Sequence, residues 1–296
     1  MANQKILSQV YESAEKIIVD DATRIIIFSD VHRGDNGYAD DFAPNENIYL
    51  HALNYYYTQG FTYIELGDGD ELWENDDFSV IREAHHEVFM LMKKFYDEGR
   101  FYLVWGNHDM ERKSAKVVEK SLYYYEENGK KKPLFENIRL HRGLLLAIQD
   151  SPIQFFLTHG HQVDVMGHRL WRYSRFVVRR IWRHLQRLGF NDPTSPAKNY
   201  RKRAKVERKL AAWITARQQP LIVGHTHRPA FPDKGQLPYF NTGSCVHPRV
   251  ITGIEIAEGN ISLVNWALKP EPKTGYLKVH KDFLHKPEKI SAYFSG

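Results

Sequence analysis

Trp105-Gly106-Asn107-His108-Asp109 is the stretch of this 296-residue chain that decides both the fold and the site. It follows a four-residue apolar run that is typical of a buried strand. Gly106 permits a sharp turn after the strand, so that three polar side chains arrive together. Asn107 offers a carbonyl oxygen to a hard cation, His108 offers a proton donor, and Asp109 offers a carboxylate that can hold the imidazole ring.

Four further apolar runs end in residues of the same kind. The run at 24–28 leads to Asp-x-His, and the run at 221–223 leads to His-x-His. Two residues one apart in an extended chain point the same way, so both side chains can reach one centre. The five strand ends together supply the candidate metal ligands Asp30, His32, Asp68, Asn107, His159, His225 and His227.

Segments with helical spacing separate the first three apolar runs, and this alternation is typical of an α/β fold. In such folds the reactive groups gather at the carboxyl ends of the strands. Residues 268–296 are polar and lysine-rich and show no clear pattern. We expect helices at about 4–18, 45–59 and 78–98, strands at 24–28, 61–66 and 101–104, a β meander formed by 137–141, 144–149 and 154–157, and a hairpin formed by 250–257 and 260–267.

The composition excludes several classes of protein. An apolar fraction of 42% is that of a globular chain rather than a disordered one. The single cysteine, Cys245, rules out an internal disulfide and a zinc cage built from thiolates. The N-terminal residues lack the apolar core of a signal peptide, and no run approaches the roughly 18 apolar residues of a membrane span. We therefore expect a soluble, cytoplasmic protein.

The ligand set indicates the kind of metal centre. Carboxylate, amide and imidazole groups without sulfur suit manganese, iron, zinc or magnesium ions. Seven ligands are too many for one tetrahedral ion and suit two ions that share a carboxylate. Two-metal sites hold their ions roughly 3.5–4 Å apart and stabilise both the attacking and the leaving oxygen of a phosphoryl displacement. We expect two divalent ions, with manganese favoured over iron, zinc and magnesium.

These motifs resemble those of the calcineurin-like metallophosphoesterases over roughly residues 22–265. The motifs that carry the resemblance are Asp30-Val31-His32, Gly67-Asp68, Gly106-Asn107-His108-Asp109, His159-Gly160 and Gly224-His225-Thr226-His227. The resemblance implies a four-layer α/β/β/α sandwich with a dinuclear metal site, here interrupted by an inserted basic helical hairpin.

The resemblance also implies a role for each matching residue. One metal would be held by Asp30, His32, Asp68 and His227, and the other by Asp68, Asn107, His159 and His225, with Asp68 bridging. His108 matches the residue that protonates the leaving group or steadies the transferring phosphoryl group, and Asp109 matches its orienting partner. For the other acidic residues near the second strand end, we expect helix capping or solvation; these are Glu65, Asp70, Glu71 and Glu74.

Residues 164–217 carry the positive charge of the chain. They contain 15 basic and 3 acidic residues, whereas the rest of the chain contains 26 basic and 33 acidic residues. Two amphipathic helices are expected in this segment, the second at about 198–217. Three interpretations remain open: a solvated basic face, an element that attracts an anionic substrate or an anionic membrane surface, and an element that grips a nucleic-acid backbone. Arginine favours phosphate contact, and the candidate substrate residues are Arg169, Arg172 and Arg175.

Helices inserted at this point loosely resemble the lid of the UDP-2,3-diacylglucosamine pyrophosphohydrolases. The chain departs from that branch at His108, where the branch has arginine. The expected organisation is a metallophosphoesterase core at 1–163 and 218–267, a basic helical cap at 164–217 and a C-terminal extension at 268–296.

The sequence thus predicts a hydrolase that cleaves a phosphodiester or pyrophosphate bond with a metal-bridging hydroxide, assisted by His108. A phosphoprotein phosphatase and a nuclease are the alternative enzymes. A non-catalytic module that binds membranes or nucleic acid is the alternative of a different class. The expected partner is an anionic, phosphate-containing substrate, with peripheral contact to an anionic membrane as an alternative and nucleic acid less favoured.

Overall fold

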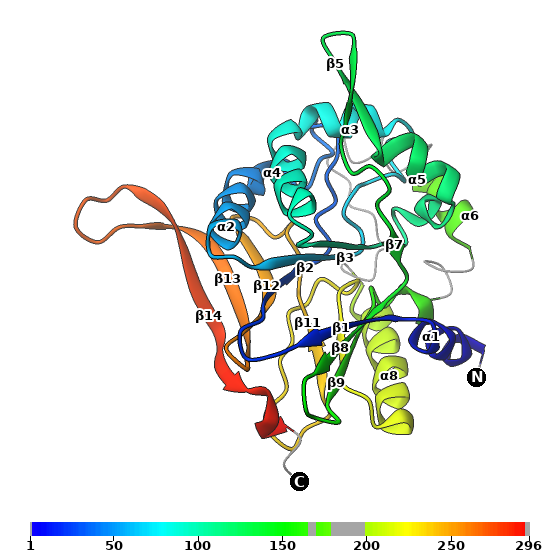
Figure 1. Ribbon diagram of the computed structural model, residues 1–296, viewed down its shortest axis with the longest axis vertical. Coiled ribbons are helices and arrows are strands. Elements are labelled where there is room, and N and C mark those ends of the chain that lie inside the picture. Colours follow the sequence, from blue (N-terminus) through cyan, green and yellow to red (C-terminus); the bar gives the residue numbers. More distant parts are fainter. Residues whose placement is uncertain (1, 165–169, 179–198, 294–296) are drawn as a thin grey trace.

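The computed structural model describes residues 2–164, 170–178 and 199–293, and its two main sheets lie face to face (Figure 1). The larger sheet has seven strands in the order β14-β13-β12-β2-β3-β4-β7. Its parallel half is formed by β2 (Arg24–Phe28), β3 (Thr62–Leu66), β4 (Phe101–Val104) and β7 (Leu140–His141). Its antiparallel half is formed by β12 (Val250–Ala257), β13 (Asn260–Pro270) and β14 (Leu277–Lys289).

The smaller sheet has five strands in the order β1-β8-β9-β10-β11. These are β1 (Glu15–Val19), β8 (Leu144–Ile148), β9 (Gln154–Leu157), β10 (Leu221–Val223) and β11 (Tyr239–Asn241). All neighbours pair in parallel except β8 and β9. A separate hairpin of β5 (Tyr124–Glu127) and β6 (Lys130–Pro133) projects from the molecule at the top of Figure 1.

Helices cover the outer face of each sheet, because each strand alternates its side chains between two apolar layers. In β2, Ile25 and Ile27 pack between the sheets, whereas Ile26 and Phe28 pack against the outer helices. The helices over the seven-stranded sheet are α2 (Glu46–Thr58), α3 (Phe78–Ala84), α4 (His86–Asp97) and α5 (Ala115–Leu122). Over the five-stranded sheet lie α1 (Ala2–Glu12) and α8 (Tyr200–Arg217). The predicted four-layer α/β/β/α sandwich is confirmed.

The second helix of the predicted basic hairpin is α8. Its apolar side chains Val206, Leu210 and Trp213 are buried against the five-stranded sheet. The predicted break between the two helices, at 192–196, lies outside the described residues. Of the preceding segment the structure describes α6 (Trp171–Val177). Among the described residues, no helix has the length and apolar character needed to cross a membrane.

The prediction of a single helix at 4–18 is wrong. Helix α1 ends at Glu12, and β1 follows and pairs in parallel with β8. Ile17 and Ile18 fit helical spacing, but β-branched residues also favour strands. In the strand they point to opposite sides, Ile17 partly buried between the sheets and Ile18 60% exposed.

The prediction of a β meander at 137–157 is also wrong in its first strand. β7 pairs in parallel with β4 in the larger sheet, whereas β8 and β9 belong to the smaller one. The chain crosses between the sheets at Arg142 and Gly143. A Cβ atom at Gly143 would lie 2.7 Å from the carbonyl oxygen of Leu157, so the crossing requires glycine. The predicted helix at 78–98 is likewise divided, into α3 and α4 with a break at His85.

Residues 277–289, for which the sequence shows no pattern, form the edge strand β14. This strand pairs with β13 along its whole length. Both of its faces are largely exposed, so the alternation of apolar and polar residues that marks a strand is absent.

Candidate metal centre

The predicted metal ligands lie in loops at the carboxyl ends of β2, β3, β4, β9 and β10, and backbone hydrogen bonds join these loops. The amide of Asp30 donates to the carbonyl of Gly67 at 3.1 Å, and the amide of His32 donates to the carbonyl of Asp68 at 2.9 Å. The amide of Gly224 donates to the carbonyl of His159 at 3.1 Å. These bonds join the β2 and β3 loops of the larger sheet, and the β9 and β10 loops of the smaller sheet.

Most of the ligand residues adopt a left-handed backbone conformation. Positive φ angles occur at Asp30 (51°), His32 (50°), Asp68 (51°), His225 (66°) and His227 (54°). Residues with a side chain rarely adopt this conformation, and it costs of the order of 1–3 kcal/mol at each position. Such strain is typical of functional sites, where the surrounding structure holds the residue in place.

One group of ligands consists of Asp30, His32 and His227. Asp30 Oδ1 lies 3.0 Å from His227 Nε2 and 3.9 Å from His32 Nε2. The two imidazole Nε2 atoms are 3.3 Å apart. All three side chains therefore direct their donor atoms at one point.

A second group consists of Asp68, His159 and His225. Asp68 Oδ2 lies 3.0 Å from His159 Nε2 and 3.9 Å from His32 Nε2. His32 is thus equally distant from a carboxylate of each group, so the two groups are adjacent.

Hydrogen bonds fix which nitrogen each imidazole directs at the centre. His159 Nδ1 donates to the carbonyl of Leu66 at 3.0 Å, and His32 Nδ1 donates to Glu71 Oε2 at 2.7 Å. The Nε2 atom of each ring is then left with its lone pair facing the ligand cluster, which is the state that binds a metal ion.

Buried ligand atoms that lack a hydrogen-bond partner also indicate a site for divalent cations. Asn107 Oδ1 and His225 Nε2 are buried and have no hydrogen-bond partner among the described residues. Buried polar atoms of this kind are costly unless a ligand satisfies them. Burial alone would raise the pKa of Asp30 and of Asp68, but neighbouring imidazoles hold both below the usual range. Both carboxylates are therefore available as anionic ligands.

His108 lies beside this cluster and is held by Glu71. His108 Nδ1 donates to Glu71 Oε1 at 2.7 Å, and the Trp73 ring stacks on the imidazole at 4.1 Å between centroids. The His108 ring also packs edge-on against His32, at 4.6 Å. Burial alone would lower the pKa of His108, but the carboxylates of Glu71 and Asp68 raise it to about 10. A protonated His108 can donate a proton beside the ligand cluster.

The structure corrects the expected partner of His108. Asp109 accepts hydrogen bonds from the backbone amides of Gly106 and Gly69 rather than from the imidazole. Its carboxylate therefore shapes the loop around His108. Burial raises the pKa of Asp109 to about 7 despite the nearby Arg112.

The expectation that Glu65, Asp70, Glu71 and Glu74 cap a helix or are solvated is wrong, because all four are buried. Arg33 makes two hydrogen bonds of 2.7 Å to the carboxylate of Glu65 and one of 2.7 Å to Asp70. Arg112 pairs with the second oxygen of Asp70. These ion pairs lie directly after the ligand His32 and form a rigid support for the site.

Sequence analysis missed Glu71 as a residue of the site. It bridges His32 and His108, one oxygen to each ring, and is only 8% exposed. Burial alone would raise the pKa of Glu71, but His108 and His32 lower it to about 2. The available signal was its position, three residues after the ligand Asp68 in the same loop.

The two described candidate substrate arginines, Arg172 and Arg175, contact residues other than the metal ligands. Arg175 forms an ion pair with Glu111, and Arg172 and Arg175 lie 5.5 and 5.1 Å from the centre of the Trp171 ring. Trp171 packs with Trp105 and Met110, which flank the loop of Asn107 and His108. Arg169 lies outside the described residues.

The fold and this constellation of ligands define a metallophosphoesterase. Residues 23–229 match the family model described as calcineurin-like phosphoesterase. The chain belongs to this family, and membership supports metal-dependent hydrolysis of a phosphoester. A search of curated proteins finds no match.

Solved structures with partial similarity include Vacuolar Protein Sorting 29 from Cryptosporidium parvum, with 14% identity and a TM-score of 0.36 over 89% of this chain and 98% of that chain. Vps29 from Chaetomium thermophilum has 10% identity and a TM-score of 0.39 over 90% and 99%. A cold-active protein-tyrosine phosphatase of a psychrophile Shewanella has 12% identity and a TM-score of 0.38 over 90% and 82%. Similarities at this level assign neither a substrate nor a partner to this chain.

Proposed function

We propose that the protein hydrolyses a phosphodiester or pyrophosphate bond with two divalent cations, manganese being favoured. The observation that supports this most directly is the juxtaposition of the two ligand groups with His108. His32 Nε2 lies 3.9 Å from a carboxylate oxygen of each group, and its ring packs on that of His108. When bound, two cations would neutralise phosphate charge and lower the pKa of bound water enough to supply hydroxide near neutral pH.

In this proposal one cation would be held by Asp30, His32, Asp68 and His227. The other would be held by Asp68, Asn107, His159 and His225. The carbonyl of Leu66 and the carboxylate of Glu71 keep two of these imidazoles in the tautomer that binds a cation. The ligand loops thereby orient a phosphate group against His108.

His108 then acts on the departing oxygen. Because its Nδ1 proton is committed to Glu71, the Nε2 proton is the one available to the leaving group. Glu71 stabilises the charged imidazole before transfer, and the stacked Trp73 ring fixes its plane. A binding scaffold without catalysis has no need of a proton donor held in this way, which argues against the non-catalytic module.

The test is hydrolysis of an aryl phosphodiester and the matching aryl phosphomonoester by the Mn²⁺-loaded protein. We expect turnover that depends on the cation, with the diester preferred. Preference for the monoester would favour the phosphatase alternative. If neither ester is hydrolysed by protein with bound Mn²⁺, the proposed reaction is contradicted and the binding module becomes the better explanation.

A further inference from the structure

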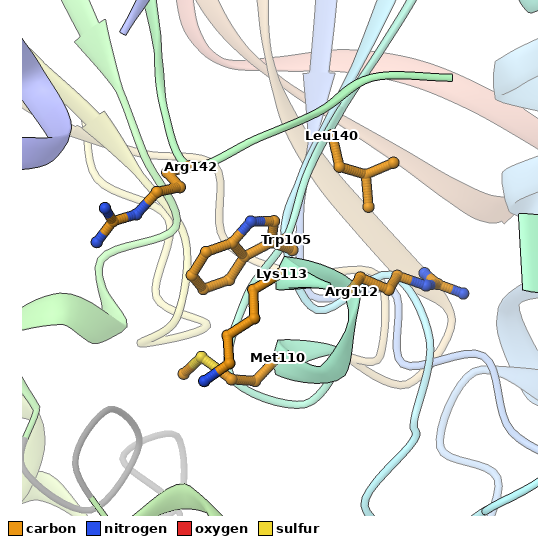
Figure 2. Close-up of a pocket in the computed structure, with 6 residues that line it drawn as sticks. All are labelled: Trp105, Met110, Arg112, Lys113, Leu140 and Arg142. Carbon is orange, nitrogen blue, oxygen red and sulfur yellow. The ribbon is translucent and has the colours of Figure 1, made fainter. Parts of the chain in front are cut away.

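A cavity of about 520 Å³ lies next to the loop that carries Asn107 and His108. Its lining comes from the end of β4, from the turn after the loop and from the crossing after β7. The lining residues are Trp105, Met110, Arg112, Lys113, Leu140 and Arg142 (Figure 2). The cavity thus shares a wall with the proposed catalytic loop.

Ring contacts connect the cavity with the metal ligands. The Trp105 ring lies 5.5 Å from that of His161, and His161 lies 5.5 Å from His159 and 6.5 Å from His225. Trp105 and Met110 are also the residues on either side of the segment that holds Asn107 and His108. The cavity is therefore a near neighbour of the ligand cluster.

The charge of the cavity is positive. Arg112 is compensated by Asp70 and Asp109, but neither Lys113 nor Arg142 forms an ion pair with a carboxylate of the described residues. Both are exposed, and none of the described residues that line the cavity is acidic. In Figure 2, Arg142 lies on one side of the Trp105 ring, and the Lys113 side chain extends below the ring. Two uncompensated cations favour an anionic ligand.

The remaining lining is aromatic and apolar. The Trp105 ring is 5% exposed, and Met110 and Leu140 belong to the same apolar cluster. Arg142 Cζ lies 6.0 Å from the centre of the Trp105 ring, and Lys113 Nζ lies 5.2 Å from that of Trp171. The cavity therefore places two cations beside a largely buried apolar cluster, a combination that suits an organic anion with an apolar body.

We propose that this cavity binds the organic group of the phosphoester substrate, and that this group carries a second anionic substituent beside a planar or apolar body. The inference rests on the proposed function, because it gives the substrate of the same site a further feature. Lys113 and Arg142 are then specificity residues, and they contact the second anionic group rather than the phosphate that is cleaved.

A matched pair of esters tests the proposal: the 4-nitrophenyl ester of thymidine 5′-phosphate and the same ester with an additional 3′-phosphate. We expect the Mn²⁺-loaded protein to have a KM about tenfold lower for the second ester, the effect of roughly one charge-assisted contact. Lys113→Ala and Arg142→Ala should reduce this KM ratio towards one, and Lys113→Arg should retain it. Lys116→Ala is the control, because Lys116 is exposed on α5 and does not line the cavity.

A binding measurement separates this inference from the proposed function. Calorimetric titration with thymidine 3′,5′-bisphosphate and with thymidine 5′-phosphate, without turnover, should show the same preference and the same loss in Lys113→Ala. Hydrolysis of both esters with equal KM values, or a preference that survives in Lys113→Ala and Arg142→Ala, would overturn the inference alone. Failure to hydrolyse either ester, with the binding preference intact, would overturn the proposed function and leave the cavity assignment standing.

Discussion

Glu71 and His108 are joined by a hydrogen bond of 2.7 Å in which the imidazole Nδ1 donates to the carboxylate. The second oxygen of the same carboxylate accepts a bond from His32, a predicted metal ligand. One buried side chain therefore links the cation-binding group with the proposed proton donor.

We expect Glu71→Gln to lower both kcat and metal affinity. The amide offers only one acceptor oxygen, so one of the two imidazoles loses its partner. Partners of metal-bound histidines typically contribute 10–100-fold to affinity or activity, and we expect a loss of about that size in each. Steady-state kinetics and Mn²⁺ titration measure the two effects. Glu83→Gln is the control, because the Glu83 side chain is 70% exposed. Unchanged kcat and affinity in Glu71→Gln would contradict the linking role.

The proposed roles of His108 and Asp68 differ, so variants at the two positions should differ in metal content and in kcat. We expect His108→Ala to retain bound metal but to lose about 10²–10⁴-fold in kcat, the usual contribution of a general acid. Asp68→Asn should lose metal occupancy, because Asp68 is the proposed shared ligand. Metal analysis and rate measurements on both variants distinguish these outcomes. A fully active His108→Ala protein would end the role proposed for that residue.

Gly67 and Gly60 offer a matched test of how closely the ligand loops pack. Both have positive φ angles, 87° and 74°. A Cβ atom at Gly67 would lie 2.7 Å from the His159 ring, whereas at Gly60 it would meet nothing within 4 Å. Alanine at either position should cost about 1–2 kcal/mol in the free energy of unfolding through backbone strain. Only Gly67→Ala should also weaken Mn²⁺ binding; equal Mn²⁺ affinities of the two variants would show that His159 tolerates the contact.

His85 gives the folded protein a pH dependence that is independent of the metal ligands. Its side chain is fully buried and pairs with Asp40 at 2.8 Å and Glu46 at 3.1 Å. Burial alone would lower the pKa of His85, but these carboxylates raise it to about 9. Because this pKa exceeds the unfolded value of about 6.5, the stabilisation is complete below about pH 6.5 and is lost as the pH rises through about 9.

Urea unfolding of the wild type and of His85→Gln near pH 6 and near pH 9.5 measures this effect. We expect the free-energy difference between the two proteins to shrink by an amount on the order of 2–3 kcal/mol at the higher pH, from about 1.4 kcal/mol per pKa unit. A difference that stays constant between the two pH values would mean that folding does not raise the pKa of His85.

The ligand loops could be predicted from the sequence because each follows a buried strand, and buried strands are continuous apolar runs. Asp30, Asp68 and His225 each come two residues after such a run, and parallel strands bring their ends to one edge. Glu71 could not be identified in the same way. An acidic residue after a strand end also suits a helix cap, and the contact between Glu71 and His108 joins two different loops of the folded chain.

The elements that were missed share a physical cause. Ile17 and Ile18 satisfy helical spacing and strand propensity equally, so only pairing with β8 decides between them. β14 is an edge strand with both faces largely exposed, so burial imposes no alternation on its sequence. In both cases the structure depends on a distant partner strand that local patterns do not record.

The left-handed backbone at five ligand residues makes the apo site a store of conformational strain. A bound cation would hold these residues in their left-handed conformation. Because the ligands come together only in the folded protein, the cation would bind and stabilise the folded state alone. Cation supply should therefore govern how long the folded protein persists, as well as how fast it works. A cell depleted of the proposed divalent cation should therefore contain less of this protein.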